Sequence, residues 1–243
     1  MPDGFFHFNI RTKSEFMVTN DWCLITRLIA LAVFAFAGTG ADANALEVLF
    51  DNLAQSSNGY SGVENTVWPA QAFTTTSTGH TLSEVSVSLW NNSGTTGGFQ
   101  IEIWDATGAG GIPGAQVGDA IYSGLAEDLS SSSGNSLTVS GLNVTLTANI
   151  TYYVVVRGTS LTGIPEPPFG EIPGGLAWDS SGTDTTAKYI TSDSGSSWIG
   201  PFNNSNQYMS VVAVPEPSTL AFACLGGLTL IWAGRKPGVK AAA

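Results

Sequence analysis

The side chains of this sequence that could perform acid–base or nucleophilic chemistry are one histidine, many serines and scattered acids. Between Leu46 and Val214 the only histidine is His80. A serine triad would need that histidine beside a serine and an acid, but the serines show no nucleophile-elbow spacing. We therefore expect His80 to be a solvent-exposed residue in the turn before a strand, and we assign no catalytic residue.

Acidic residues form the second candidate group. Two carboxylates on either side of a sugar could hydrolyse a glycoside, and the candidate pairs are Glu102 with Asp105 and Asp179 with Asp184. Nothing in their spacing selects either pair. Ordinary surface acids explain them equally well, so we do not expect an enzyme.

Two turn-like stretches, Asp179–Asp184 and Asp193–Gly195, supply oxygen atoms of the kind that Ca²⁺ prefers. Asp and Ser in such turns commonly cap their own backbone instead. We expect no cofactor and assign no metal ligand, with a structural Ca²⁺ as the alternative that stays open.

Two tryptophans indicate a different kind of site. Two runs of alternating apolar and polar residues predict half-buried strands, joined as a hairpin by Asn91–Gly98. In that hairpin Trp90 and Trp104 would share one face, where they could stack on sugar rings while Gln100 and Glu102 form hydrogen bonds. The alternative is that loops or a second sheet cover this face. The apolar positions of the two runs are Val85, Val87, Leu89, Phe99, Ile101 and Ile103.

Charge excludes one class of partner. The formal net charge is -11, and between Leu46 and Val214 the only cations are Arg157 and Lys188. A nucleic-acid partner would need a basic surface. Charged residues make up 11% of the chain while glycine alone counts 29, a profile typical of a turn-rich extracellular β domain.

Strands are the elements that must position these residues. Tyr152–Val156 is apolar at every position, which predicts a central strand covered on both faces. We predict an all-β domain over residues 46–213, an antiparallel two-sheet β-sandwich of jelly-roll type. Further strands are expected at Leu46–Phe50, Gln71–Thr75, Ala120–Ser123, Leu137–Val144, Gly175–Asp179, Lys188–Thr191 and Tyr208–Ala213.

Residues 1–45 have the pattern of a signal peptide. Arg27 precedes the apolar run Leu28–Ala37, and Ala43 and Ala45 are the small residues that signal peptidase tests. We expect a signal helix here, with cleavage after Ala45. The segment before Arg27 is long for this class, so Met17 is an alternative start.

Residues 214–243 contain three parts in order. Pro215-Glu216-Pro217 comes first, a short apolar run from Thr219 to Ala233 follows, and Arg235 and Lys236 end it. A relaxed membrane helix needs roughly 20 residues, so this predicted transmembrane helix is short. The positive charges resist translocation, which predicts export of the body while the tail stays in the inner membrane. Two prolines keep the tripeptide extended, and we expect it to be an unpaired handle.

This tripartite tail resembles the PEP-CTERM sorting signal of Gram-negative bacteria, through Val214-Pro215-Glu216-Pro217, the apolar helix and the basic stop Arg235-Lys236. The resemblance implies that exosortase, a membrane-embedded cysteine transpeptidase, processes the chain. A second Pro-Glu-Pro at 165–167 has no apolar helix after it and is expected to be a loop.

The body shows a second pattern in six segments: Trp68–Thr75, Thr81–Val87, Phe99–Trp104, Ile112–Gly114, Leu146–Val156 and Ala177–Trp178. These segments resemble the choice-of-anchor R type of bacterial surface domain. That resemblance implies a sandwich fold and brings no biochemical activity and no catalytic residue.

These features predict an exported, non-enzymatic protein of the cell surface or extracellular matrix. Its expected partners are the general export machinery, signal peptidase, exosortase and, transiently, the inner membrane. One alternative is a carbohydrate-binding module for an exopolysaccharide that carries the same signal. Another is a plain membrane-anchored periplasmic protein that is never processed.

Overall fold

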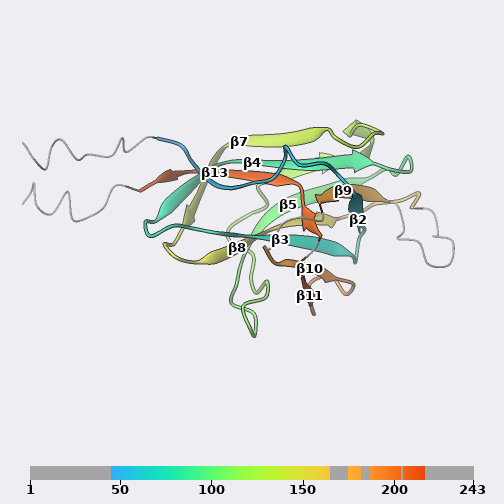
Figure 1. Cartoon of the computed structure of the whole chain (residues 1–243). Coiled ribbons are helices and arrows are strands. Elements are labelled where there is room, and N and C mark those ends of the chain that lie inside the picture. Colours follow the sequence, from blue (N-terminus) through green and yellow to red (C-terminus); the bar gives the residue numbers. More distant parts are fainter. Residues whose placement is uncertain (1–44, 165–174, 182–185, 204, 217–243) are drawn as a thin grey trace, which may run out of the picture. The chain divides into compact units, whose positions relative to one another are not determined.

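A computed structural model describes residues 45–164, 175–181, 186–203 and 205–216. These residues form two antiparallel sheets that lie face to face, as the sequence predicts (Figure 1). The expected signal helix, the apolar run Thr219–Ala233 and the basic stop Arg235-Lys236 lie outside the described residues. Within the described ranges, no helix is both long and apolar enough to cross a membrane.

One sheet has seven strands in the order β1-β13-β4-β9-β12, with β2 beside β9 and β7 beside β4. The last strand, β13, is paired on both edges, by β1 and by β4. The bounds of these strands are β1 (Glu47–Asp51), β2 (Gly59–Val63), β4 (His80–Asn91), β7 (Ser136–Leu146), β9 (Leu176–Ser181), β12 (Asn206–Gln207) and β13 (Met209–Pro215).

The other sheet has six strands in the order β11-β10-β3-β8-β5-β6. Its central strand β8 is buried throughout Tyr152–Val156, which confirms the predicted doubly covered strand. A short 3-10 helix, η1 (Ala126–Asp128), follows β6. The strands are β3 (Trp68–Thr74), β5 (Gly98–Asp105), β6 (Tyr122–Leu125), β8 (Thr151–Gly158), β10 (Lys188–Thr191) and β11 (Ile199–Phe202).

The hydrophobic core lies between the two sheets. Trp178 is fully buried there and donates its indole N–H to the carbonyl of Tyr208 at 2.8 Å. Burial of each large apolar side chain stabilises the fold by about 1.5–3 kcal/mol. Both alternating apolar runs contribute to this core, through Val85, Val87 and Leu89 of β4 and Phe99, Ile101 and Ile103 of β5.

The predicted hairpin between these two runs is wrong, because β4 and β5 belong to opposite sheets. Asn91 ends β4 and turns the chain across the sandwich. Its side-chain NH₂ group donates to the backbone carbonyls of Thr95 at 2.7 Å and Ala126 at 3.0 Å. Its side-chain carbonyl accepts the backbone N–H of Thr95 at 2.9 Å. The apolar side chains of the two runs therefore point into the core from opposite sheets.

A bulge near the start of β4 decides the position of the histidine. The register against β7 shifts between Leu82 and Glu84, so Leu82 and Val85 both face the core. His80 lies on the same side as Leu82, and its side chain is fully buried. The expectation of a solvent-exposed turn histidine is wrong, because the strand begins at His80 itself.

Lys188 of β10 is buried at one end of the sandwich, with 5% of its surface exposed. Its ammonium group donates to the hydroxyls of Ser205 at 2.7 Å and Ser61 at 3.2 Å and lies 5.8 Å from the ring centroid of Phe202. Among the described residues it forms no ion pair. Burial disfavours the charged form and lowers the pKa of Lys188 to about 8.

We predict that this lysine makes stability rise with pH. Its folded pKa of about 8 lies below the usual value of 10.5, so the unfolded chain holds the proton more tightly between those values. The free energy of unfolding should therefore increase by about 1.5 kcal/mol between pH 8 and 9.5. Denaturant unfolding of the wild type and of Lys188→Met measures this, since other groups titrate alike in both proteins. Parallel pH curves for the two proteins would contradict the prediction.

Candidate functional site

The C-terminal end of β13 is the first candidate site, because the expected sorting tail begins there. β13 extends to Pro215, two residues past the expected end of the body at Ala213. β1 accompanies it only as far as the pair of Glu47 with Ala213, whereas β4 continues beside it, with Thr81 opposite Val214 and His80 opposite Pro215. The described chain enters and leaves the sandwich at this one end (Figure 1).

Backbone pairing continues into the tripeptide itself. The N–H of Glu216 donates to the carbonyl of Gly79 at 2.8 Å. Proline has no N–H, so Glu216 carries the only backbone donor of Pro215-Glu216-Pro217, and Gly79, the residue just before β4, holds it. The expectation of an unpaired handle is therefore wrong for Pro215 and Glu216, while Pro217 lies outside the described residues.

A hydrogen-bonded contact between His80 and Glu47 lies beside this end. Nε2 of His80 is 2.9 Å from a carboxylate oxygen of Glu47 and 3.4 Å from the hydroxyl of Thr76. The imidazole is fully buried, whereas about a third (34%) of the Glu47 side chain is exposed. Within the described ranges Nδ1 of His80 has no hydrogen-bond partner. The histidine thus joins the start of β1 to the start of β4.

A second candidate site lies on the outer face of the seven-stranded sheet, where the sheet divides. β4 pairs with β13 as far as Val87 and with β9 from Leu89 onward. Between them, the N–H of Ser88 donates to the carbonyl of Tyr208 at 3.1 Å, and the N–H of Tyr208 donates to the carbonyl of Asp179 at 2.8 Å. Because the neighbouring strands diverge there, a space opens above Ser88.

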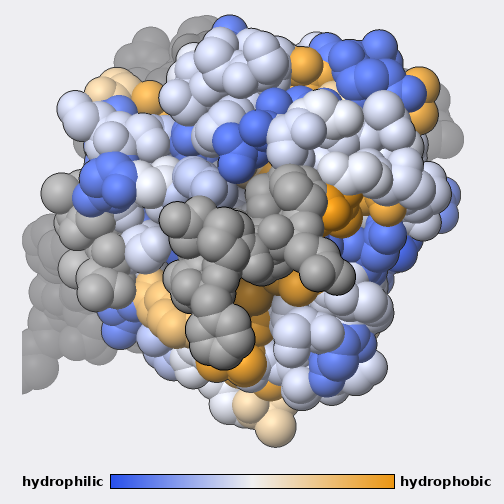
Figure 2. All heavy atoms as spheres, turned by 90° about the vertical axis from the view of Figure 1, so that its right-hand side faces the viewer, coloured by the Kyte–Doolittle hydropathy of each residue, from blue (hydrophilic) through white to orange (hydrophobic). Residues whose placement is uncertain are grey.

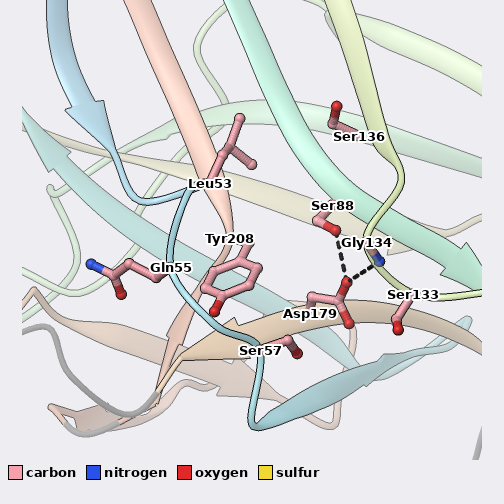
Figure 3. Close-up of a pocket in the computed structure, with 9 residues that line it drawn as sticks. All are labelled: Leu53, Gln55, Ser57, Ser88, Ser133, Gly134, Ser136, Asp179 and Tyr208. Carbon is pink, nitrogen blue, oxygen red and sulfur yellow. Dashed lines mark hydrogen bonds between the residues drawn. The ribbon is translucent and has the colours of Figure 1, made fainter.

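This space is a polar cavity of about 200 Å³ (Figure 3). Asp179, at its base, is 1% exposed and accepts hydrogen bonds from the hydroxyl of Ser88 at 2.7 Å, the indole N–H of Trp90 at 3.0 Å and the N–H of Gly134 at 3.0 Å. Its walls come from the loops around residues 53–57 and 133–136. A hydroxyl-rich lining with one carboxylate suits a neutral or cationic polar ligand and repels anions.

Trp90 lies beside this cavity and is half-buried. Its ring meets the ring of Tyr60 edge to face, with centroids 5.6 Å apart. The amide of Asn92 donates to the hydroxyl of Tyr60 at 3.3 Å. The aromatic pair therefore lies next to Asp179, through the indole N–H of Trp90, but neither ring lines the cavity.

Trp104 lies on the outer face of the other sheet, so the structure does not bring it together with Trp90. Its ring packs edge to face against Trp68 and Trp198, with centroids 6.3 and 5.8 Å away. The hydroxyl of Tyr153 donates to the carbonyl of Gly111 at 2.5 Å, which ties the β5–β6 loop over this face. Loops thus cover part of the Trp104 surface.

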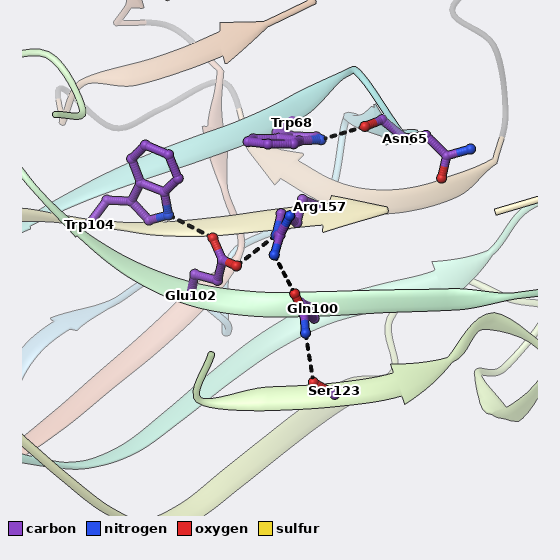
Figure 4. A network of polar contacts seen from close by, with 7 residues as sticks. All are labelled: Asn65, Trp68, Gln100, Glu102, Trp104, Ser123 and Arg157. Atoms are coloured by element: carbon purple, nitrogen blue, oxygen red, sulfur yellow. Dashed lines mark hydrogen bonds and ion pairs between the residues drawn. The ribbon is translucent and has the colours of Figure 1, made fainter. Parts of the chain in front are cut away.

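Below Trp104 runs a chain of polar contacts, drawn in Figure 4. Glu102 is buried, accepting the indole N–H of Trp104 at 2.8 Å and the Nε–H of Arg157 at 2.6 Å. Arg157 also donates to the side-chain carbonyl of Gln100 at 2.6 Å and lies 5.4 Å from the ring centroid of Trp68. This network fixes side chains on β5, β8 and β3 in one layer.

The other acids considered above serve as turn caps. Asp105 accepts the N–H groups of Thr107 at 3.1 Å and Ala115 at 2.9 Å. Asp193 accepts the hydroxyl groups of Ser197 and Thr191, both at 2.6 Å. These bonds lower the pKa of Asp193 to about 2 and hold the loop that carries Trp198.

Metal ligands are not grouped in the described ranges, where no three His, Cys, Asp or Glu side chains come together. Asp184 lies outside those ranges.

The end of the sandwich opposite the chain termini presents mainly hydrophilic and neutral residues, with apolar ones beside the atoms drawn in grey (Figure 2). The large exposed apolar side chains of the described residues are Leu46, Val48, Leu125, Ile150, Ile199 and Phe202.

Sequence reasoning missed the contacts that organise these sites. Asp179 was one of several equivalent acids, and Glu47 and Tyr60 carried no motif. A polar residue at the outward position of a strand gives no sign of a dividing sheet, since that depends on long-range pairing.

The family comparison addresses the first site. A model described as the PEP-CTERM protein-sorting motif matches residues 213–236. The chain carries a PEP-CTERM sorting motif. No match to this chain is found among the curated proteins.

The PEP-CTERM motif supports exosortase-dependent sorting of an exported protein to the cell envelope or surface. Its matched range begins at Ala213, inside β13. The sorting motif and the last strand of the sandwich therefore share the residues from Ala213 to Pro215.

Proposed function

We propose that this chain is a non-enzymatic protein of the bacterial cell surface or extracellular matrix. Residues 1–45 direct export and are removed by signal peptidase, and residues 214–243 hold the chain in the inner membrane until exosortase acts. The observation that carries the proposal is the sorting motif at residues 213–236, which directly continues the last strand of a folded β domain.

The environments of the reactive side chains favour a non-enzymatic role. His80 is buried against Glu47, Glu102 is engaged by Arg157, and Asp179 accepts three hydrogen bonds. Each group thus has a structural partner, and the proposed role needs no cofactor. The likeness of the body to the choice-of-anchor R domain belongs to the same proposal, and the antiparallel two-sheet architecture agrees with it.

Mass spectrometry of the mature, surface-located protein tests this proposal. In cells with exosortase we expect a chain that begins at Leu46 and lacks the peptide Gly234–Ala243, because processing removes the basic end of the tail. In cells without exosortase that peptide should remain. Its presence on surface protein in both strains would mean an ordinary membrane anchor.

The chain offers a matched control for this experiment. Pro-Glu-Pro occurs at 165–167 as well as at 215–217. Glu216→Ala should block removal of the tail, whereas Glu166→Ala should leave processing unchanged. Equal effects of the two substitutions would show that exosortase does not depend on the tripeptide at 215–217, which directly precedes the tail.

Carbohydrate binding is the second candidate function, and the Asp179 cavity favours it. Sugars present hydroxyl groups at their edges and apolar C–H faces, which hydroxyl-rich cavities and aromatic side chains can contact. Ser88 and Asp179 line the cavity, and Trp90, which donates its indole N–H to Asp179 at 3.0 Å, adds an aromatic ring next to it together with Tyr60. A cavity of about 200 Å³ is smaller than typical ligand pockets of about 300–1,000 Å³, so it suits a single sugar unit.

This candidate predicts different roles for the two tryptophans. Titration with polysaccharide from the producing cell should change tryptophan fluorescence in the wild type and in Trp104→Ala. Trp90→Ala should not show this fluorescence change, and its affinity should fall about five- to thirtyfold, since stacking and hydrogen-bond contacts are worth on the order of 1–2 kcal/mol. No fluorescence change in the wild type, or equal loss in both variants, would count against the Asp179 cavity.

A further inference from the structure

We propose that the folded domain controls the access of exosortase to the sorting motif. Val214, Pro215 and Glu216 must separate from β4 before the enzyme can bind the tripeptide backbone. Glu47 and His80 are positioning residues that set how readily this separation occurs. The inference rests on the proposed processing of the tail by exosortase.

The tripeptide has a single backbone hydrogen-bond donor. Enzymes that bind an extended segment pair with its backbone N–H and carbonyl groups. In Pro215-Glu216-Pro217 only Glu216 has an N–H, and that group already donates to the carbonyl of Gly79 at 2.8 Å. An enzyme that uses this donor must first break the bond to Gly79.

The pairing of β13 becomes weaker toward its C-terminal end. Up to Ala213, β13 is paired on both edges, with Glu47 of β1 on one side and Leu82 of β4 on the other. Beyond Ala213, β4 is the only strand of the described residues that remains paired with β13, and Pro215 contributes no donor to the ladder. Strand ends with few backbone hydrogen bonds open locally at small free-energy cost. The motif therefore lies where the strand opens first.

The contact between His80 and Glu47 restrains this opening. His80 is the residue opposite Pro215, and its buried ring is held by the carboxylate of Glu47 at 2.9 Å. Among the described residues, the other hydrogen-bond partner of Nε2 is the hydroxyl of Thr76 at 3.4 Å, in the loop that leads to Gly79. Without Glu47 the buried ring would lack its main partner, which destabilises the start of β4. Gly79, whose carbonyl holds the N–H of Glu216, directly precedes β4.

Glu47 lies outside the range matched by the sorting motif, so its substitution leaves the sequence read by exosortase unchanged. In cells with exosortase, pulse-chase labelling measures how fast the full-length chain loses its tail. Glu47→Ala should be processed about three- to tenfold faster, which corresponds to about 0.7–1.4 kcal/mol, the size of a single net hydrogen bond. Glu47→Gln, which keeps an amide oxygen, should lie between Glu47→Ala and the wild type.

Two control variants separate local opening from general loss of stability. Glu84→Ala removes an acid from β4 whose side chain has no hydrogen bond or ion pair among the described residues, and it should leave the processing rate unchanged. Ile103→Val weakens the core from the other sheet and should lower the thermal unfolding midpoint without faster processing. If Glu47→Ala matches the wild type, or Ile103→Val accelerates processing as much as Glu47→Ala does, the proposal is wrong. A wild-type chain that is not processed even with exosortase would instead refute the proposed function.

Discussion

The pairing of β13 on both edges is the constraint on which the rest of this structure depends. β13 is the last strand in the described part of the chain, yet it lies inside the seven-stranded sheet, between β1 and β4. Its inward side chains Met209, Val211 and Ala213 are completely buried. The core cannot close without the residues that directly precede the sorting tripeptide, so the fold and the delivery signal share one strand.

A shared strand changes how the sorting tail can work. A flexible linker would let the tail act independently of the domain that it delivers. Here Pro215 is still paired with β4, and the only backbone donor of the tripeptide is bonded to Gly79. The state of the domain and the availability of the signal are therefore physically linked, through contacts that involve His80 and Glu47.

The sequence was informative where the pattern is local. Alternation and apolar runs located most strands, including the central strand β8, and composition together with the tail indicated an exported β domain. The pairing of strands that are distant in the sequence could not be predicted from these local patterns. Asn91, by bonding Thr95 and Ala126, sends consecutive strands into opposite sheets. This separates Trp90 from Trp104, and the bulge after Leu82 buries His80. The short strands β2, β11 and β12 carry weak alternation, and their pairing depends on long-range partners.

Amide hydrogen exchange at Glu216 tests the central claim most directly, because the two flanking prolines leave it as the only exchanging amide of the tripeptide. In the full-length chain in detergent, the account predicts that this amide exchanges at least about tenfold more slowly than an unstructured reference. Exchange at the reference rate while the amide of Val212 stays protected would contradict it. That result would mean that the strand ends before the sorting motif.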